Sequence, residues 1–339
     1  MSGRARVGLV GFGSAGAGIH TPLLRAAGLD VVRVVTSDAG RRADVEREWP
    51  DAVCLSSIAA LLAEPGRLDV LVLASPSGVH AEQAIAGLQA GVPVVVDKPL
   101  GVDGDQAARV TQCADDLGVP LTVFQNRRWD AEQLTLRRLL ADGELGEVFR
   151  FERRWERWRP EPKDRWRENA TAADGGGLLL DLHSHLVDSA VQLFGRVRRV
   201  YAELAAHTTP SEDDAFLALE HESGVRSHLG ALSVAGAPGP RTRVLGRAGS
   251  YVVTDFEAEA TAFADFADPD DEHCGWVVAG DERRAVPRAP GSAVDFYRAV
   301  AEAVTTGSPM PVDPHDAVHV LDVLDAARVS AAQHRVVPL

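Results

Sequence analysis

The first half of the chain alternates short apolar runs with segments that suit helices. The apolar runs are rich in valine and leucine and lie at 7–10, 30–36, 52–55, 68–74, 92–97 and 119–124. The helix-compatible segments lie between them, at 19–27, 56–62, 79–90 and 103–117. Strands that alternate with helices in this way predict a parallel sheet with right-handed crossovers. We therefore expect residues 1–125 to form a doubly wound Rossmann domain.

The second half has a different pattern. Residues 148–155 alternate apolar and polar positions, which is typical of a half-buried strand. Another strand is expected within 195–204, helices at 131–140 and 292–305, and hairpins around Ser223-Gly224, around Ala248-Gly249 and within 276–286. This pattern predicts an α+β domain over residues 126–310, built on an open, mostly antiparallel sheet.

The C-terminal segment, residues 311–339, predicts one amphipathic helix. Asp313-Pro314 suits the N-cap and first helical position. We expect this helix to pack back on the Rossmann domain. An open sheet with an apolar face usually finds a partner, so a homodimer or homotetramer formed through the second domain's sheet is also expected.

A glycine-rich turn follows the first apolar run. It has the form G-x-G-x-x-G, in which the first glycine makes a tight turn, the second admits a pyrophosphate and the third lets the helix pack on the strand. The helix N-terminus then presents N–H groups to the phosphates. We expect the dinucleotide to contact Gly11, Phe12, Gly13, Ser14, Ala15 and Gly16.

The end of the second strand is where a Rossmann fold meets the adenosine ribose. An acidic residue there suits NAD, because it would repel a 2′-phosphate. This chain has Thr36 and Ser37, followed by Arg41 and Arg42, and hydroxyl and guanidinium groups suit a 2′-phosphate. NADP is therefore favoured over NAD. Two alternatives remain: Asp38 takes the ribose hydroxyls, or the arginines form a solvated helix face.

Polar residues also follow the later strands, where ligands of parallel sheets bind. Lys98 lies where the nicotinamide end of a cofactor is expected, and its ammonium could polarise an oxygen during hydride transfer; the alternative is a structural ion pair with Asp97 or another acid. Residues just past the Rossmann strands, together with two from 165–168, are further candidates for contact with the cofactor: Ser75, Pro76, His80, Asp97, Lys98, Asn126, Arg127, Trp166 and Arg167. Trp129 and Trp166 could instead simply fill a domain interface.

A second constellation begins at a triple glycine, residues 175–177. Asp181 and His185 have helical i, i+4 spacing, which predicts a shared face. His185 has the chemistry of a proton shuttle, and Asp181 could orient the imidazole or the substrate. A metal site is disfavoured because a helix would turn His183 away from the other two. The alternative without function is an N-cap-like Asp181 and a core His185.

Composition narrows the class of protein. The 339 residues carry 35 basic and 49 acidic side chains, a formal charge of −14, which disfavours nucleic acid and anionic membranes as partners. There is no apolar run long enough to span a membrane, and the apolar stretch near the N-terminus is cut by glycines. The three cysteines are far apart, which predicts buried thiols in a reducing compartment. We expect a cytoplasmic protein.

Together these motifs resemble the glucose–fructose oxidoreductase/inositol dehydrogenase (Gfo/Idh/MocA) family along nearly the whole chain. The resemblance rests on residues 11–16, 74–80, 97–99 and 176–185, and residues 124–130 and 165–168 are similar to the NADP-dependent scyllo-inositol dehydrogenase branch. It implies a substrate site lined by Lys98, Asp181 and His185. Gln125 stands where that branch often has histidine, and His183 replaces a usual glycine, so the polyol is left open.

The sequence thus predicts an NADP(H)-dependent oxidoreductase acting on a cyclic polyol or sugar, with no metal. His185 would be the general base, Lys98 would stabilise the developing oxygen charge, and Asp181 would orient the substrate or His185. One alternative is an isomerase or hydrolase of this fold that retains NAD and oxidises its substrate transiently. The other is a non-enzymatic NADP-sensing protein.

Overall fold

The computed structural model describes residues 4–162, 169–171, 175–254 and 263–339. The contacts within the chain define two compact units, one formed by Met1–Asn126 with Ser292–Val318 (unit 1) and one by Arg127–Gly291 with His319–Leu339 (unit 2). From the sequence, residues 292–310 are expected in the second domain and the whole last helix beside the Rossmann domain. The structure instead divides this part of the chain at residue 318.

Unit 1 contains the predicted parallel sheet. Its six strands have the order β3-β2-β1-β4-β5-β6, and every neighbouring pair is parallel. The strands are β1 (Arg6–Val10), β2 (Asp30–Val35), β3 (Val53–Leu55), β4 (Val70–Leu73), β5 (Val94–Asp97) and β6 (Leu121–Phe124). This order confirms the doubly wound Rossmann arrangement and brings the carboxyl ends of β1, β4 and β5 side by side.

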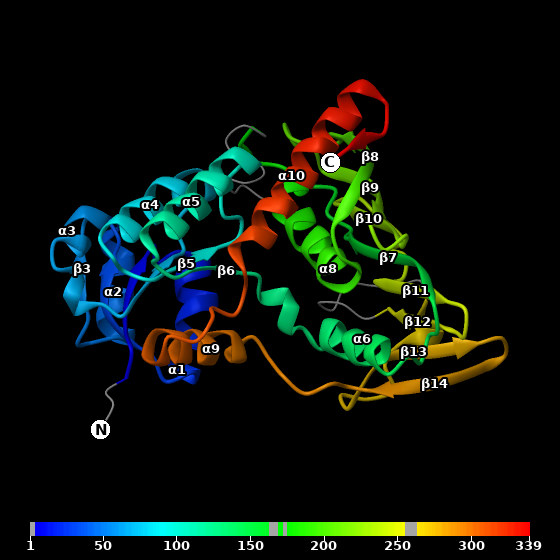
Figure 1. Cartoon of the computed structure of the whole chain (residues 1–339), viewed down its shortest axis with the longest axis horizontal. Coiled ribbons are helices and arrows are strands. Elements are labelled where there is room, and N and C mark those ends of the chain that lie inside the picture. The colour runs from blue at the N-terminus through cyan, green and yellow to red at the C-terminus, as the bar shows by residue number, and fades with distance from the viewer. Residues whose placement is uncertain (1–3, 163–168, 172–174, 255–262) are drawn as a thin grey trace. The chain divides into compact units, whose positions relative to one another are not determined.

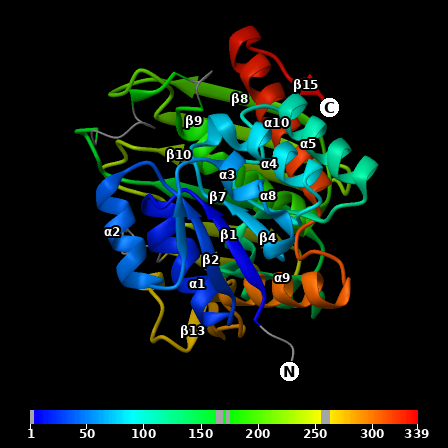
Figure 2. The same ribbon diagram turned by 90° about the vertical axis from the view of Figure 1, so that its left-hand side faces the viewer.

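Helices cover both faces of this sheet. They are α1 (Thr21–Ala26), α2 (Ala39–Glu48), α3 (Ile58–Leu62), α4 (His80–Gln89), α5 (Gly104–Leu117) and α9 (Val294–Thr306). Helices α1 and α9 pack together on one face, and α4 and α5 pack together on the other (Figures 1 and 2). Helix α9 joins unit 1 because Phe296 and Tyr297 are fully buried against the ring of Phe124.

Unit 2 is built on a nine-stranded sheet with the order β14-β13-β12-β11-β7-β10-β9-β8-β15. Its strands are β7 (Val148–Glu156), β8 (Val197–Ala205), β9 (Asp214–His221), β10 (Arg226–Leu232), β11 (Thr242–Gly246), β12 (Ser250–Val253), β13 (His273–Ala279), β14 (Glu282–Pro287) and β15 (Val337–Pro338). The three predicted hairpins are present as antiparallel pairs. Only β7 and β10 pair in parallel among the described strands of this sheet, so the mostly antiparallel prediction is confirmed.

Strand β7 lies in the middle of that sheet, and the central part of the strand is buried on both faces. Phe151, Glu152 and Arg153 are consecutive and all buried, although their side chains alternate between the two faces. Glu152 is covered because it pairs with Arg154 and Arg243 on neighbouring positions. The expectation of a half-buried strand is therefore wrong at the centre of β7, where ion pairs hide a charged residue from water.

Among the residues that the structure describes, the helices that belong wholly or mainly to unit 2 are α6 (Ala131–Ala141), α8 (Ser184–Phe194) and α10 (Pro314–Gln333). Helix α10 begins as predicted, with Asp313 accepting a hydrogen bond from the backbone N–H of His315. Further along α10, His319 and Ser330 accept hydrogen bonds from backbone N–H groups of β8. These side chains satisfy strand donors that β15, only two residues long, does not reach.

The three cysteines are free thiols, but only Cys274 is buried; Cys54 and Cys113 are half-buried. No helix within the described residues is long and apolar enough to cross a membrane.

Candidate functional site

The predicted dinucleotide turn links β1 to the first helix of unit 1. A Cβ on Gly11 would lie 2.6 Å from the carbonyl oxygen of Ala74, and one on Gly16 would lie 2.1 Å from the carbonyl oxygen of Gly11, so neither position admits a side chain. A Cβ on Gly13 would meet nothing closer than the Arg41 guanidinium, at 4.0 Å. The second glycine thus leaves open space beside the backbone, which fits a pyrophosphate.

The helix after this turn starts earlier than expected. The sequence predicts a helix from residue 19, whereas helical structure begins at Ser14 and continues to Ala26. Its first part includes a π-helical turn, Gly16–His20, closed by the Thr21 N–H to the Gly16 carbonyl. The Thr21 hydroxyl donates to the same carbonyl at 2.7 Å. Because the helix begins directly after Gly13, its first N–H groups stand beside the open glycine.

The ribose end of the candidate cofactor site is formed by the turn from β2 to α2. Asp38 is the N-cap of α2, and Oδ1 accepts a hydrogen bond from the Arg41 N–H at 2.8 Å. The Arg42 Nε donates to the Thr36 carbonyl at 3.3 Å, and Thr36 is buried. Ser37 and Arg41 are exposed. The guanidinium of Arg41 thus lies near Gly13, on the side where phosphates are expected.

The ends of β4 and β5 carry the predicted nicotinamide-side residues. Ser75 donates to the Gln83 Oε1 at 2.6 Å, and Pro76 precedes a short 3₁₀ turn. Both ring nitrogens of His80 lie 2.8 Å from carbonyl oxygens, those of Pro99 and Ser75. His80, expected as a cofactor contact, therefore joins the two strand-end loops through its ring.

Asp97 ends β5 and Lys98 follows it. The Asp97 Oδ1 accepts a hydrogen bond from the Lys98 backbone N–H at 2.9 Å, and Lys98 is 9% exposed. Burial opposes ionisation of Asp97, but His20 and the charges of His80 and Lys98 hold the pKa of this carboxyl below its ordinary value. An anionic residue thus precedes the lysine and holds its backbone.

Unit 2 carries the second predicted constellation. A Cβ on Gly177 would lie 2.3 Å from Glu212 Oε1, and the same oxygen accepts from the Leu179 N–H at 3.3 Å. Glu212 therefore caps this helix, and Asp181 lies inside it rather than at its N-cap. The absence of a side chain at Gly177 allows the helix to start this close to the carboxylate.

This helix also contains a π-helical turn, Leu179–His183, before it continues as α8. The expectation that Asp181 and His185 share a face assumes regular α-helical spacing, so the wider turn removes that argument. Asp181 is half-buried and His185 is 7% exposed. The Nε2 of His183 lies 3.1 Å from the Ala215 carbonyl oxygen, and burial lowers the pKa of His183 to about 4. The neutral His183 therefore serves as a backbone hydrogen-bond donor.

Trp155 on β7 packs beside His185 in unit 2. Their ring centres are 5.8 Å apart. Three guanidinium groups, from Arg127, Arg157 and Arg241, lie 4.8 to 5.1 Å from the centre of the same indole. Arg127 is a candidate from the sequence, whereas Trp155, Arg157 and Arg241 are not. With Arg127 they come from three separate segments of the chain, so no sequence spacing relates them. The imidazole of His185 thus lies beside an indole ring that three positively charged side chains contact.

A buried ion network supports this part of unit 2. Glu132 is paired with Arg153 at 3.0 Å and with Arg241 at 3.2 Å. The two arginines and a hydrogen bond from Thr242 overcome burial and lower the pKa of Glu132 to about 2. Burial lowers the pKa of Arg241 to about 10. Glu132 therefore stays ionised and holds Arg241 against Trp155, while Arg153 lies over the ring of Phe151.

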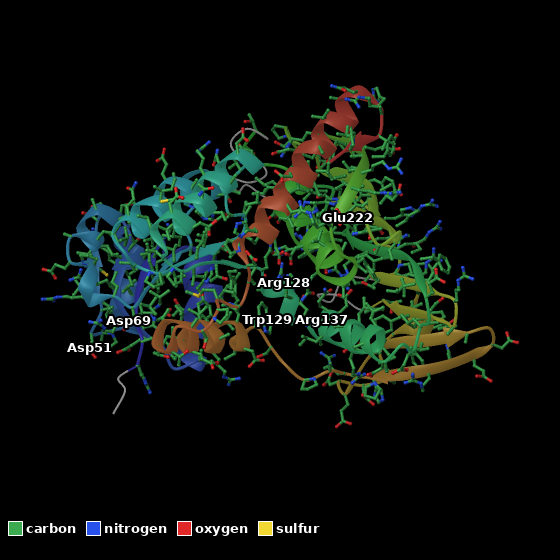
Figure 3. All side chains as sticks on the ribbon, viewed as in Figure 1. Asp51, Asp69, Arg128, Trp129, Arg137 and Glu222 are labelled. Carbon is green, nitrogen blue, oxygen red and sulfur yellow. The ribbon has the colours of Figure 1, made fainter. Side chains whose placement is uncertain are left out.

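A second buried pair lies nearby in sequence. Arg128, which is labelled in Figure 3, lies on the turn before α6. Its guanidinium binds both carboxylate oxygens of Asp188 on α8, at 2.6 to 3.2 Å. Such a two-pronged pair fixes orientation as well as charge. It ties the helix that carries His185 to the segment that carries Arg127.

Of the other predicted contacts, Asn126 is half-buried, while Trp166 and Arg167 lie outside the described residues, as do the neighbouring Arg165 and Glu168. Within the described ranges, no group of three or more histidine, cysteine, aspartate or glutamate side chains is arranged to hold a metal ion. The residues that fit a dinucleotide are those of the open glycine turn and the arginines on α2, and a nicotinamide supplies the hydride acceptor or donor when bound.

Comparisons with known proteins identify the family of both halves of the chain. Residues 5–125 match the model of an oxidoreductase family with an NAD-binding Rossmann fold, and residues 133–252 match the GFO/IDH/MocA C-terminal domain. The chain is 29% identical to a scyllo-inositol 2-dehydrogenase (NADP(+)) of Bacillus subtilis, over 98% of this chain and 96% of that protein.

Two further relatives match over nearly their whole length. An oxidoreductase of Escherichia coli named YdgJ is 33% identical, over 99% of this chain and 98% of the relative. A solved oxidoreductase structure from Yersinia pestis superposes with a TM-score of 0.87 at 33% identity, covering 100% of this chain and 98% of that one.

Proposed function

The chain belongs to the Gfo/Idh/MocA oxidoreductase family and is a dehydrogenase acting on CH–OH groups, and from that premise we propose that it uses NADP(H) to interconvert a hydroxyl and a ketone on a cyclic polyol or sugar such as an inositol. The observation that carries this proposal is Lys98 at the end of β5, directly held by ionised Asp97. The similarity to an NADP-dependent scyllo-inositol dehydrogenase supports the substrate class.

The proposed chemistry divides the work between two side chains. In the oxidative direction a bound nicotinamide would supply the hydride acceptor for the alcohol carbon, and His185 would take the hydroxyl proton. Lys98 places a positive charge at the same oxygen and stabilises the negative charge that develops there. Asp181 orients the substrate or His185. The reverse direction uses the same groups with the proton returned by His185.

The arrangement of side chains after β2 favours NADP over NAD as the cofactor. Asp38 caps α2 through Arg41, while the Arg41 guanidinium lies near Gly13 and Arg42 is tied to Thr36. Two guanidinium groups suit a 2′-phosphate better than a free carboxylate does. The binding roles of residues 11–16, Thr36, Ser37, Ser75, Pro76, Asp97, Asn126 and Arg127 remain part of this proposal.

We also propose a cytoplasmic homodimer or homotetramer formed through the unit 2 sheet. Phe216 on β9 is 36% exposed and its ring lies 6.0 Å from that of His228 on β10, so this face carries exposed aromatic surface. Light scattering coupled to size exclusion tests it. Phe216→Arg should reduce the mass to that of a smaller species, and an unchanged mass would contradict the proposed interface.

A panel of inositols, sugars and sugar acids tests the function. Nicotinamide absorbance monitors each reaction, with NADP and NAD in separate assays. We expect turnover of at least one cyclic polyol or sugar, faster with NADP. Product formed without net absorbance change would indicate a retained cofactor, and binding without turnover would indicate a sensor. Either outcome overturns the proposal.

The role of His185 is tested on the substrate so found. His185→Ala should lower kcat roughly 10²- to 10⁴-fold, the usual contribution of a general base. His273→Ala is the matched control, because His273 is a half-buried histidine paired with Asp270 in the same unit. Retention of full kcat by His185→Ala would remove the base from the mechanism.

A further inference from the structure

A buried polar chain in unit 1 leads to the residue before Lys98. The Tyr297 hydroxyl on α9 lies 2.5 Å from Nδ1 of His20, the last residue of the first π-helical turn. The other ring nitrogen, Nε2, lies 3.7 Å from Oδ2 of Asp97. Tyr297 and His20 are both completely buried. Three residues from distant parts of the sequence therefore form the line Tyr297–His20–Asp97.

Aromatic packing fixes the imidazole in this line. The ring centre of Phe124 lies 4.6 Å from that of His20 and 5.5 Å from that of Tyr297. Phe124 is the register partner of Asp97 across β5 and β6. Burying a polar ring and a hydroxyl among aromatic groups costs free energy unless they are paired. The shell leaves the imidazole little freedom other than the choice of tautomer.

The groups next to Nδ1 and Nε2 of His20 determine which of the two nitrogens carries the ring proton. Burial, and then the charge of Asp97, raises the pKa of Tyr297 well above its ordinary value, so the hydroxyl keeps its proton and can donate to Nδ1. Nε2 then carries the ring proton and points at the Asp97 carboxylate. At 3.7 Å this contact is electrostatic rather than a full hydrogen bond, and Nε2 has no hydrogen-bond partner among the described residues.

The line continues through Asp97 to the lysine backbone. While Oδ2 faces His20, Oδ1 accepts the hydrogen bond from the Lys98 N–H. On the other side of the lysine, His80 lies 2.8 Å from the carbonyl oxygen of Pro99. The backbone is thus held before and after Lys98, which restricts where its ammonium group can reach.

We propose that His20 and Tyr297 are positioning residues that act through Asp97 on Lys98. Tyr297 sets the tautomer of His20, His20 sets the orientation of the Asp97 carboxylate, and the carboxylate fixes the lysine backbone. This inference rests on the proposed function in one respect, namely that Lys98 acts on the reacting oxygen. The arrangement of the three side chains does not depend on which substrate is used.

The kinetic test compares conservative and disruptive variants. His20→Leu should lower kcat roughly tenfold, within the range of coupling energies for contacting residues, with the KM for NADP changed less than about threefold. His20→Gln keeps an N–H near the position of Nε2 and should recover most of kcat. Tyr297→Phe should lower kcat with little change in KM. Its matched control is Tyr251→Phe, because Tyr251 is an equally buried tyrosine that donates to a backbone carbonyl in unit 2.

A mutant cycle tests whether the effect passes through Asp97. His20→Leu should cost less than about threefold in an Asp97→Asn background, because the carboxylate it orients is absent. Equal costs in both backgrounds would overturn the proposal, as would equal loss of kcat in Tyr297→Phe and Tyr251→Phe at matched melting temperatures. Thermal unfolding of every variant separates lost folding from lost positioning.

A readout independent of activity uses the ¹⁵N chemical shifts of the histidine rings. The His20 signals, identified by their loss in His20→Gln, should show protonated Nε2 and unprotonated Nδ1, and Tyr297→Phe should change this tautomer balance. If the panel of substrates shows no turnover, the proposed function is wrong, but the ¹⁵N chemical shifts still test the proposed tautomer of His20 independently. An Nδ1-protonated ring in the unaltered protein would overturn the inference even in an active enzyme.

Discussion

The carboxylate of Asp38 accepts a hydrogen bond from the backbone N–H of Arg41 and thereby caps helix α2. In a Rossmann fold an acidic residue in this region can hold the ribose hydroxyls and repel a 2′-phosphate. Here Oδ1 of Asp38 is used in the helix cap, and the guanidinium of Arg41 lies toward Gly13. The cap therefore bears directly on the choice between NADP and NAD.

The double variant Arg41→Ala/Arg42→Ala should raise the KM for NADP about tenfold or more, because a hydrogen bond to a charged group contributes about 1.5–3 kcal/mol. The KM for NAD should change much less, since NAD has no 2′-phosphate. Initial rates with both cofactors measure this. Arg47→Ala on the same helix, which loses only an exposed pair with Asp44, is the control. Equal effects on the two cofactors would rule out a 2′-phosphate site here.

Lys98→Met should lower kcat about 100-fold or more, because it removes a positive charge from the oxygen on which negative charge develops. The KM for NADP should change only a few-fold if the lysine acts mainly on that oxygen. Steady-state kinetics in both directions measure the effect, and Lys98→Arg separates the need for charge from the need for the lysine shape. A kcat within threefold of the unaltered enzyme would show that Lys98 is structural.

Glu132→Gln should destabilise the protein by about 3–5 kcal/mol, because it leaves Arg153 and Arg241 buried without their countercharge. Denaturant unfolding at neutral pH measures this change. The comparison is Glu220→Gln, which removes a carboxylate paired with the half-exposed Arg198 and Arg199 and should cost less than about 1 kcal/mol. Similar losses from the two variants would mean that the buried network adds no special stability.

His183 should make the folded protein sensitive to mild acid. Its pKa is about 4 when folded and about 6.5 when unfolded, so between about pH 6.5 and pH 4 the unfolded chain binds this proton and the folded protein does not. Stability therefore falls as the pH drops from about 6.5 to about 4, by an amount on the order of 3 kcal/mol. His183→Gln keeps a donor for the Ala215 carbonyl but cannot titrate. Unfolding curves across this range should show a weaker pH dependence in the variant, whereas parallel curves would contradict the assignment.

The fold could be predicted from local pattern because its signals are local. Apolar runs separated by glycine-ended helices define the parallel sheet, and two-residue turns such as Ser223-Gly224 define the hairpins. What the pattern missed depends on distant contacts. Helix α9 joins unit 1 through Phe296 and Tyr297 on Phe124, a match of surfaces that no spacing along the chain reveals.

The sequence indicates candidate site residues where one motif carries several roles, as at Gly11–Gly16 and Asp97-Lys98, and their roles stay predictions. Its supporting residues were not predicted, because each comes from a different segment. His20 stands out only because it is buried beside Tyr297, which is distant in the sequence. Trp155 stands out only because arginine side chains surround it in the folded structure. The face shared by Asp181 and His185 was argued from regular spacing that the π-helical turn does not follow.

The helix that contains His20 and the helix that contains His185 each include a π-helical turn, at Gly16–His20 and at Leu179–His183. Such a turn accommodates one residue more than an α-helical turn. Deleting a single residue within either segment would remove the extra residue and restore a regular α-helix, with the two flanking parts in nearly the same relative rotation. The extra residue at these two points therefore sets which side chains the turn presents to the candidate site, while the packing of the rest of each helix does not depend on it.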